Sequence, residues 1–174
     1  VASFRPIEVI DIRPISNTSS NITFIQCDMM APIDNTLLDY CDSLSCLHAM
    51  EHFGLGRYGD PVNYDGYLLG IENLTRMLRR GGTLYFSVPI GPQRIEFDAH
   101  RVFALSHVFE LFQDAYRVDH FSFVDDQNNL HEDVEDIDED ILYDLMRDYG
   151  DVEECEITIY GPLEHEIEEE WDEE

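Results

Sequence analysis

The sequence contains no lysine, and its 38 acidic side chains face only 10 arginines, which gives a formal net charge of −28 over 174 residues. A field this negative repels phosphate backbones, so we expect no direct nucleic-acid partner. The chain has no apolar run of about 18 residues that would cross a membrane. It also has no basic, apolar and small-residue start of the kind that marks a signal peptide.

The four cysteines lack the CxxC spacing that zinc knuckles and thioredoxin-like redox sites use. Cys27 and Cys46 lie in apolar, strand-like runs, where cysteines are mostly buried thiols. This use of cysteine favours a reducing, cytoplasmic setting. The hydrophobic content of 44% over 174 residues is enough for one core, so we expect a single domain.

Acidic residues are concentrated in the C-terminal part of the chain. Residues 1–124 hold 15 acids and 9 arginines, whereas residues 125–174 hold 23 acids and one arginine. We expect an α/β domain over residues 1–163 with an acidic insertion at about 125–140, followed by an acidic tail at 164–174. The simplest interpretation of the acidic part is a solvated surface. Adaptation to high salt, nucleic-acid mimicry and docking of a basic protein partner are the alternatives.

Periodicity predicts a strand–helix–strand unit in the middle of the chain. Residues 42–47 and 83–88 read as strands, and residues 66–80 as a helix that stops at a glycine pair. Such units build parallel sheets with helices on both faces, and ligands bind beyond the carboxyl ends of the strands. Further strands are predicted at 6–12, 21–26, 116–124 and 156–160, and further helices at 102–113 and 141–149.

Several motifs of this central region resemble a known family. The strand at 42–47, the HxxEH of residues 48–52, the helix ending in MLRRGG and the strand TLYFSVP resemble the second half of class I S-adenosylmethionine-dependent methyltransferases. The longer phrase EHFGLGRYGDP, followed by VPIGPQRIEFDAHRVF, resembles one uncharacterised, methyltransferase-like domain-of-unknown-function family. The match covers about residues 4–125. It implies a Rossmann-like α/β fold with a mostly parallel sheet, helices on both faces, and S-adenosylmethionine as the cofactor.

The resemblance implies cofactor-binding roles for four residues. Asp11, at the end of its strand, would accept hydrogen bonds from both ribose hydroxyls. Asp28 would accept from the adenine amino group, the Met29 N–H would meet a ring nitrogen, and Leu47 would also line the cofactor. For the two aspartates the alternative is a structural turn or cap, since aspartate is common in turns.

The resemblance also implies a first strand and a Gly-rich loop for the methionine part of the cofactor. That strand would lie in the middle of the sheet, between the strands that end at Asp11 and Leu47, and the sequence contains neither strand nor loop. We therefore expect an N-terminally truncated piece of a longer protein or a degenerate member that cannot bind the cofactor. In either case the sheet closes around a gap, uses another segment or borrows one.

Three polar residues follow the strand at 42–47. His48 and His52 share one face of a helical turn, a spacing that can chelate a metal, whereas Glu51 is not placed as the base of an HExxH motif. Pocket lining, acid–base work and simple capping are the other interpretations, and we assign no metal ligand. We expect His48, Glu51 and His52 to face the substrate, with His100 as the candidate general base because its ordinary pKa lies near working pH.

Residues 54–59 match GxGxxG in form only, because a dinucleotide fingerprint opens a helix directly after a strand and here the helix starts near Gly66. We expect a flexible loop or lid over the site, with Arg57 and Tyr58 available to a substrate. Residues 91–101 leave the next strand at the same edge. They bring Arg94 and Arg101, a pair suited to an anionic or sugar-phosphate substrate.

Structural ion pairing of Arg101 with Glu96 or Asp98 is the alternative role for that arginine.

Together these features predict methyl transfer from S-adenosylmethionine to an oxygen or nitrogen of a small molecule or sugar. One alternative is a non-catalytic methyltransferase-like scaffold whose acidic end binds a basic partner. Another is a metal-dependent hydrolase that uses His48, His52 and a carboxylate. The sequence does not define an oligomeric state.

Overall fold

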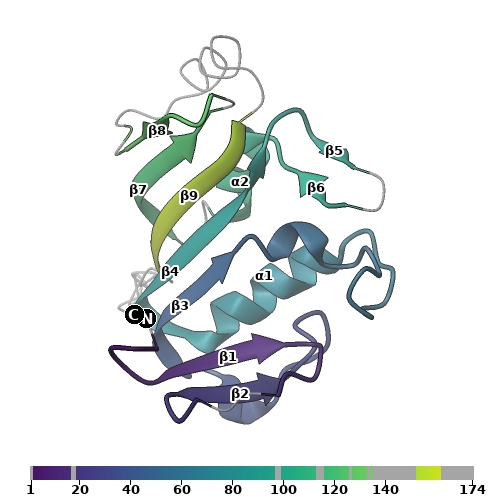
Figure 1. The fold of residues 1–174 in the computed structure, drawn as a ribbon, viewed down its shortest axis with the longest axis vertical. Coiled ribbons are helices and arrows are strands. Elements are labelled where there is room, and N and C mark those ends of the chain that lie inside the picture. The colour runs from purple at the N-terminus through teal and green to yellow at the C-terminus, as the bar shows by residue number, and fades with distance from the viewer. Residues whose placement is uncertain are drawn as a thin grey trace, which may run out of the picture.

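The computed structural model describes residues 2–16, 19–96, 99–112, 116–125, 127–132, 134 and 152–161, the last range by its backbone only. Its main element is a five-stranded sheet with strand order β3-β4-β9-β7-β8, and a separate pair, β1-β2, lies at the β3 end (Figure 1). A small hairpin, β5-β6, follows β4. The strands are β1 (Ile7–Asp11), β2 (Ile22–Gln26), β3 (Cys41–Leu47), β4 (Leu78–Ile90), β5 (Arg94–Ile95), β6 (Arg101–Val102), β7 (Arg117–Val124), β8 (Leu130–His131) and β9 (Val152–Gly161).

The two N-terminal strands pair in parallel, with Ile7 opposite Ile22 and Asp11 opposite Gln26. This confirms the strands predicted at 6–12 and 21–26. Apolar side chains of the pair pack on the main core, and the Tyr40 hydroxyl donates a hydrogen bond to Glu8 Oε1 at 2.9 Å. In the described residues, however, no strand ladder joins β1 to β3. The two sheets are therefore held together by side-chain packing.

The predicted strand–helix–strand unit is present, since β3 pairs in parallel with β4 and α1 (Gly66–Met77) crosses between them. The helix ends three residues earlier than predicted. Its last carbonyls, of Arg76 and Met77, accept hydrogen bonds from the backbone amides of Asp39 and Tyr40, and Leu78 already belongs to β4. The glycine pair therefore does not stop the helix. It lies in an irregular part of β4, where the register with β3 shifts.

The five-stranded sheet is mixed and not mostly parallel as predicted. The closing strand expected at 156–160 is β9, which lies between β4 and β7 and runs antiparallel to both. β7, predicted at 116–124, therefore runs in the same direction as β4. The short strand β8 pairs with the end of β7 inside the segment predicted as an acidic insertion. Residues 126, 133 and 135–140 of that insertion lie outside the described residues, as do the predicted helix at 141–149 and the tail at 164–174.

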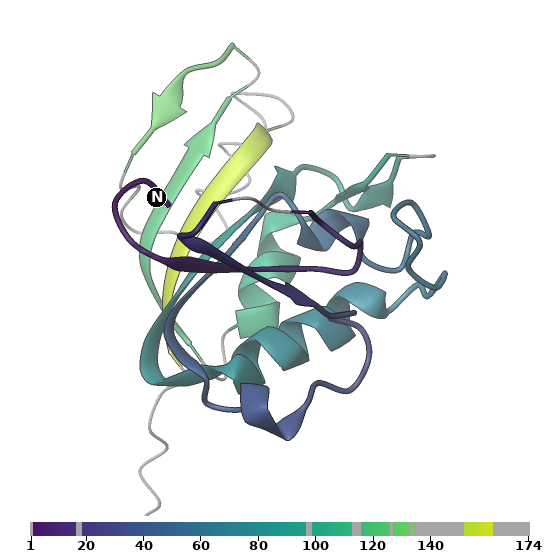
Figure 2. The same cartoon turned by 60° about the horizontal axis from the view of Figure 1, so that its bottom comes forward.

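Both helices cover the same face of the five-stranded sheet (Figure 2). α2 (Leu105–Phe112) starts later than predicted because Arg101 and Val102 belong to the β5-β6 hairpin. On the opposite face, Tyr85 is 43% exposed, so the described residues do not form the expected layer of helices on that side. The buried core lies between the sheet and the helices and includes Met50, Ile71, Leu74, Met77, Leu84, Phe86, Val88, Ile90, Phe103, Val108 and Phe112.

Cys46 is buried, as predicted, and burial raises the pKa of its thiol to about 12, whereas Cys27 is partly exposed. Among the described residues, no helix combines the length and the apolar character that crossing a membrane requires.

Candidate functional site

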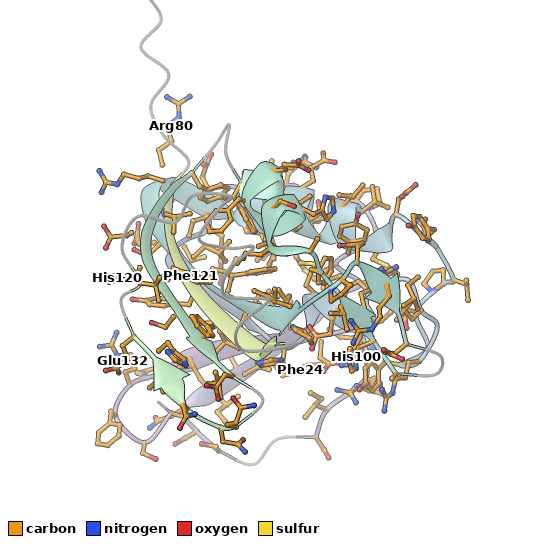
Figure 3. All side chains as sticks on the ribbon, turned by 90° about the horizontal axis from the view of Figure 1, so that it is seen from above. Phe24, Arg80, His100, His120, Phe121 and Glu132 are labelled. Carbon is orange, nitrogen blue, oxygen red and sulfur yellow. The ribbon has the colours of Figure 1, made fainter. Side chains whose placement is uncertain are left out.

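The predicted site residues lie where four strands end. Asp11 closes β1, Asp28 follows β2, and His48 follows β3. The β5-β6 hairpin, which carries His100 just before β6, follows β4. Figure 3 shows His100 on one side of the molecule among many polar side chains. β1 is paired with β2, Arg13 after β1 lies over the Tyr58 ring in the loop after β3, and His52 of that loop contacts His100.

Asp11 is engaged by Arg13 on the same chain segment. Arg13 donates from its backbone N to Asp11 Oδ1 at 2.8 Å, and from Nε and Nη2 to Oδ1 and Oδ2 at 3.0 and 2.8 Å. These bonds hold the pKa of the Asp11 carboxyl below its ordinary value. A ribose at this position would have to share the carboxylate with Arg13 or displace the guanidinium.

Asp28 and Met29 form a turn with two unused hydrogen-bonding groups. Asp28 Oδ1 accepts from Met30 N at 2.9 Å, which is the capping arrangement weighed above. In the described residues, Asp28 Oδ2 and the Met29 N–H have no hydrogen-bond partner. Asn73 holds the turn by donating to the Met29 carbonyl at 2.8 Å. An adenine edge, which presents an amino donor beside a ring-nitrogen acceptor, is complementary to this pair of groups.

Glu51 is buried between two histidines in the short helix η2 (Met50–His52). Its Oε1 lies 3.6 Å from His48 Nδ1 and 3.7 Å from His52 Nε2, and its Oε2 is buried without a partner among the described residues. Burial raises the pKa of this carboxyl, and His48 offsets only part of that effect. His48 itself has a φ of +48°, a conformation that costs about 1–2 kcal/mol outside glycine. Strain and an unpaired buried carboxyl together are typical of functional sites.

His52 is tied to the hairpin after β4. Its Nδ1 lies 3.0 Å from the Ala99 carbonyl oxygen, and because a carbonyl only accepts, Nδ1 carries a proton. In the neutral ring Nε2 is then the acceptor, and it lies 3.7 Å from Glu51 Oε1. Burial lowers the pKa of His52, and nearby Arg57 and His100 lower it further. The ring meets Tyr58 edge-on at 5.3 Å and His100 at 6.3 Å between centroids. The structure thus brings His48, Glu51, His52 and His100 into one group.

The GxGxxG-like segment is organised around Asp60. This carboxylate accepts from Gly54 N at 2.9 Å and Gly56 N at 3.1 Å through Oδ2, and from Tyr58 N at 3.1 Å through Oδ1. Gly54 has a φ of +75°, and a Cβ there would lie 1.9 Å from a backbone oxygen, so only glycine fits. The amides that a phosphate loop would offer to its ligand are occupied by Asp60. This supports the interpretation of the motif as accidental.

The two hairpin arginines do not form an exposed pair. Arg101 is 2% exposed and donates to the carbonyls of Phe53 and Tyr64, the latter at 2.9 Å. It therefore anchors the loop after η2 to the hairpin. Arg94 forms an ion pair with Glu96 at 2.5 Å. The alternative pairing of Arg101 with Glu96 is thus not formed, and Asp98 lies outside the described residues.

The sequence itself matches one family. The family model described as "Caenorhabditis protein of unknown function, DUF268" matches residues 20–148. The chain belongs to this family. No curated protein sequence matches this DUF268 member. This membership confirms the expectation of an uncharacterised family.

Solved structures show which fold the DUF268 chain shares. The 1,6-didemethyltoxoflavin-N1-methyltransferase of Burkholderia thailandensis, solved with bound 1,6-didemethyltoxoflavin and S-adenosylhomocysteine, is 13% identical, with 88% of this chain and 60% of that chain covered and a TM-score of 0.54. The [4+2]-cyclase SpnF is 11% identical over 84% and 59%, with a TM-score of 0.54. A putative S-adenosylmethionine-dependent methyltransferase from Listeria monocytogenes is 8% identical over 90% and 80%, with a TM-score of 0.51.

The fold is therefore that of the class I S-adenosylmethionine-dependent methyltransferases. The chain spans about three fifths of the length of the first two structures. At these identities the similarity concerns the fold alone. Among the described residues, no group of three or more His, Cys, Asp or Glu side chains is placed to hold a metal ion.

Three contributors to the site were not predicted from the sequence. Arg13 follows Asp11 by two residues, and an aspartate–arginine pair at that spacing is a weak signal because it is common in turns. Asp60 could have been suspected as a loop organiser, since it directly follows a glycine-rich run. The carbonyl of Ala99 accepts hydrogen bonds from His52 and Arg57. Nothing in the sequence predicts this role, because it belongs to the backbone of an alanine.

Proposed function

We propose that this protein is an S-adenosylmethionine-dependent methyltransferase-like enzyme that acts on a small molecule or sugar. One continuous set of contacts carries the proposal. Arg13 binds Asp11 at the end of β1 and lies over the Tyr58 ring at 4.5 Å, and Tyr58 contacts His52. The residue expected to hold the cofactor and those expected to face the substrate therefore adjoin each other.

The adenosine half of the cofactor fits the residues present. The free Asp28 Oδ2 and Met29 N–H would meet the adenine edge, and Asp11 would meet the ribose while sharing its carboxylate with Arg13. Leu47, 51% exposed at the end of β3, offers an apolar contact beside them. When bound, S-adenosylmethionine supplies an activated methyl group to a nucleophile.

The residues of this chain would position the acceptor and take its proton. Burial lowers the pKa of His52 and favours the neutral ring, in which Nδ1 donates to Ala99 and Nε2 is unprotonated. The ring of His100, the candidate general base, lies 6.3 Å away between centroids. Glu51 would hold or receive a proton between His48 and His52, because burial favours its neutral form. In-line positioning with a base is what methyl transfer to an oxygen or nitrogen requires.

A non-catalytic scaffold is the second candidate. A [4+2]-cyclase is among the similar structures, so the fold is compatible with more than one activity. The 23 acids of residues 125–174 would suit a basic partner, and they lie mostly outside the described residues. The metal-dependent hydrolase that uses His48 and His52 has no comparable support, since no three-ligand group is formed in the described part of the chain.

Calorimetric titration of S-adenosylhomocysteine tests the proposal. The protein should be used together with any residues that precede Val1 in its natural form. Asp28→Ala should weaken binding by about 1–3 kcal/mol, the usual effect of losing a hydrogen bond to a charged group, and Asp11→Ala should do the same. Asp65→Ala is the matched control, because that aspartate makes no side-chain cap at the start of α1.

Two results would separate the candidates. Binding that depends on Asp28 and Asp11 but not on Asp65 supports the enzyme and directs the search to acceptors. Absence of binding, or binding that is indifferent to both aspartates, rejects the proposed cofactor site. The scaffold would then be tested with basic proteins.

A further inference from the structure

Arg57 is an exposed arginine of this acidic protein that lies beside His52 and the hairpin after β4. Five others, Arg13, Arg76, Arg79, Arg94 and Arg117, each lie within ion-pair distance of a carboxylate. Arg57 is exposed, donates one hydrogen bond to the Ala99 carbonyl at 2.9 Å, and has no carboxylate partner in the part of the chain that the structure describes. Its charge is therefore not compensated locally, in a chain whose net charge is −28.

The Tyr58 ring brings a second guanidinium to the same place. The Arg13 guanidinium carbon lies 4.5 Å and the Arg57 guanidinium carbon 5.6 Å from the ring centroid, both within cation–π range. Tyr58 is itself held by its backbone bond to Asp60. The ring therefore orients two cations that come from distant parts of the sequence.

Most N–H donors of the two arginines are unused. A guanidinium has five N–H groups; Arg13 gives two of them to Asp11, and Arg57 gives one to Ala99. The remaining donors have no partner among the described residues. Burial is the main cause of the lowered pKa of His52, and Arg57, His100 and His48 lower it further.

We propose that Arg13 and Arg57, arranged around Tyr58, form an oxyanion site that binds the carboxylate or phosphate group of the acceptor. Guanidinium groups suit both oxyanions, because their paired N–H donors match two oxygens. The site lies beside His52 and His100, so an acceptor held there by its anionic group places the rest of the molecule near the candidate base. Assigning the anion to the acceptor rests on the proposed function, whereas anion binding by the two arginines does not.

Titration of inorganic phosphate, and separately of acetate, into the full chain tests this site. The readout is the set of arginine Nε–Hε resonances in nitrogen–proton NMR spectra, at constant ionic strength set with chloride. The Arg13 and Arg57 resonances should shift together and saturate. Arg57→Gln should weaken binding about tenfold, the effect of one charge-assisted hydrogen bond, and Arg57→Lys should recover part of the loss.

Arg80→Gln is the matched control, since it removes the same charge from an exposed arginine. Figure 3 shows Arg80 pointing out of the molecule, on the side opposite His100. Binding by this variant should equal that of the wild type. Equal weakening by Arg80→Gln, or unshifted Arg13 and Arg57 resonances with both anions, would overturn the inference.

A last arm separates the anion site from the cofactor site. S-adenosylhomocysteine carries its own carboxylate, so it is added at saturation to the phosphate-bound protein. Simultaneous binding assigns the anion to the acceptor, whereas displacement assigns the arginines to the cofactor and overturns the inference. A chain that binds phosphate through Arg57 but never binds S-adenosylhomocysteine would contradict the proposed function and leave the anion site standing.

Discussion

Replacing Arg101 with methionine should strongly destabilise the protein. Methionine retains a long apolar stem but cannot donate to the carbonyls of Phe53 and Tyr64, and it loses the cation–π contact with Tyr67 at 5.0 Å. A net hydrogen bond from a charged donor contributes about 1.5–3 kcal/mol. Part of this is offset because burial opposes the charge, as the lowered pKa of Arg101 shows. We expect the free energy of unfolding to fall by about 2–4 kcal/mol.

Urea denaturation followed by far-ultraviolet circular dichroism measures this change. The m-value, the slope of the free energy of unfolding against urea concentration, should stay constant, because the surface exposed on unfolding hardly changes. The midpoint urea concentration should fall. Arg101→Lys keeps the charge but has one nitrogen in place of the guanidinium fork. It should therefore lower the free energy of unfolding by about half as much as Arg101→Met. Amide hydrogen exchange at residues 54–64 should accelerate in the methionine variant, because the loop loses its anchor.

Arg80→Met supplies the control, since it exchanges the same residue types at an exposed position. It should change the free energy of unfolding by no more than about 0.5 kcal/mol. If Arg101→Met unfolded at the same urea concentration as this control, the anchoring role would be refuted. Arg101 would then return to the predicted role of a substrate-binding arginine.

Three further predictions concern the surroundings of the same loop. Asp60→Ala removes the acceptor of three backbone amides and should cost about 1–2 kcal/mol in urea unfolding. Asp65→Ala removes the same charge without a side-chain cap and should have little effect; equal losses would contradict the loop-organising role. Gly66→Ala should cost about 2–3 kcal/mol despite the helix preference of alanine, because its Cβ would lie 2.5 Å from a methionine sulfur and 2.9 Å from the loop backbone. At Gly59 an added Cβ meets open space and only the φ of +89° is unfavourable, so Gly59→Ala should lower the free energy of unfolding by about 1 kcal/mol in a thermal melt. A larger loss of stability at Gly59 than at Gly66 would disprove the close approach of Gly66 to the loop backbone. For Glu51, burial raises the folded-state pKa above the ordinary 4.5, so the folded form binds more protons than the unfolded form and stability falls as pH rises from 4.5 through that raised value. Glu51→Gln has no proton to lose, so its advantage over the wild type should grow across this range, and a pH-independent difference would reject the assignment.

The elements with strong local patterns were predicted well. β1, β2, β3 and β7 appear within one residue of their predicted bounds, because apolar and β-branched runs between turn residues are local signals. The end of α1 was missed. Its last carbonyls are satisfied by Asp39 and Tyr40, which lie more than thirty positions earlier in the chain, and no window around Met77 contains that information.

Some features of the candidate site could likewise be predicted from the sequence, and others could not. The grouping of His48, Glu51 and His52 follows from their spacing in the sequence, and their place after a strand could be predicted. The role of Arg101 could not, since its partners are backbone carbonyls of a separate loop. The contact of Arg13 with Tyr58 likewise joins two segments that share no sequence signal.

The sequence by itself determined the charge, the strand and helix types, and the residues that stand at strand ends, because these depend on composition and on periods of two or 3.6 residues. The tertiary structure decided that β9 inserts antiparallel between β4 and β7, and that helices cover one face of the sheet in the described residues. It also decided which arginines are buried anchors, such as Arg101, and which are exposed, such as Arg57. Those outcomes depend on burial and on long-range pairing. In these cases the partner of each backbone hydrogen-bonding group or charged side chain lies far away in the sequence, where local patterns do not reveal it.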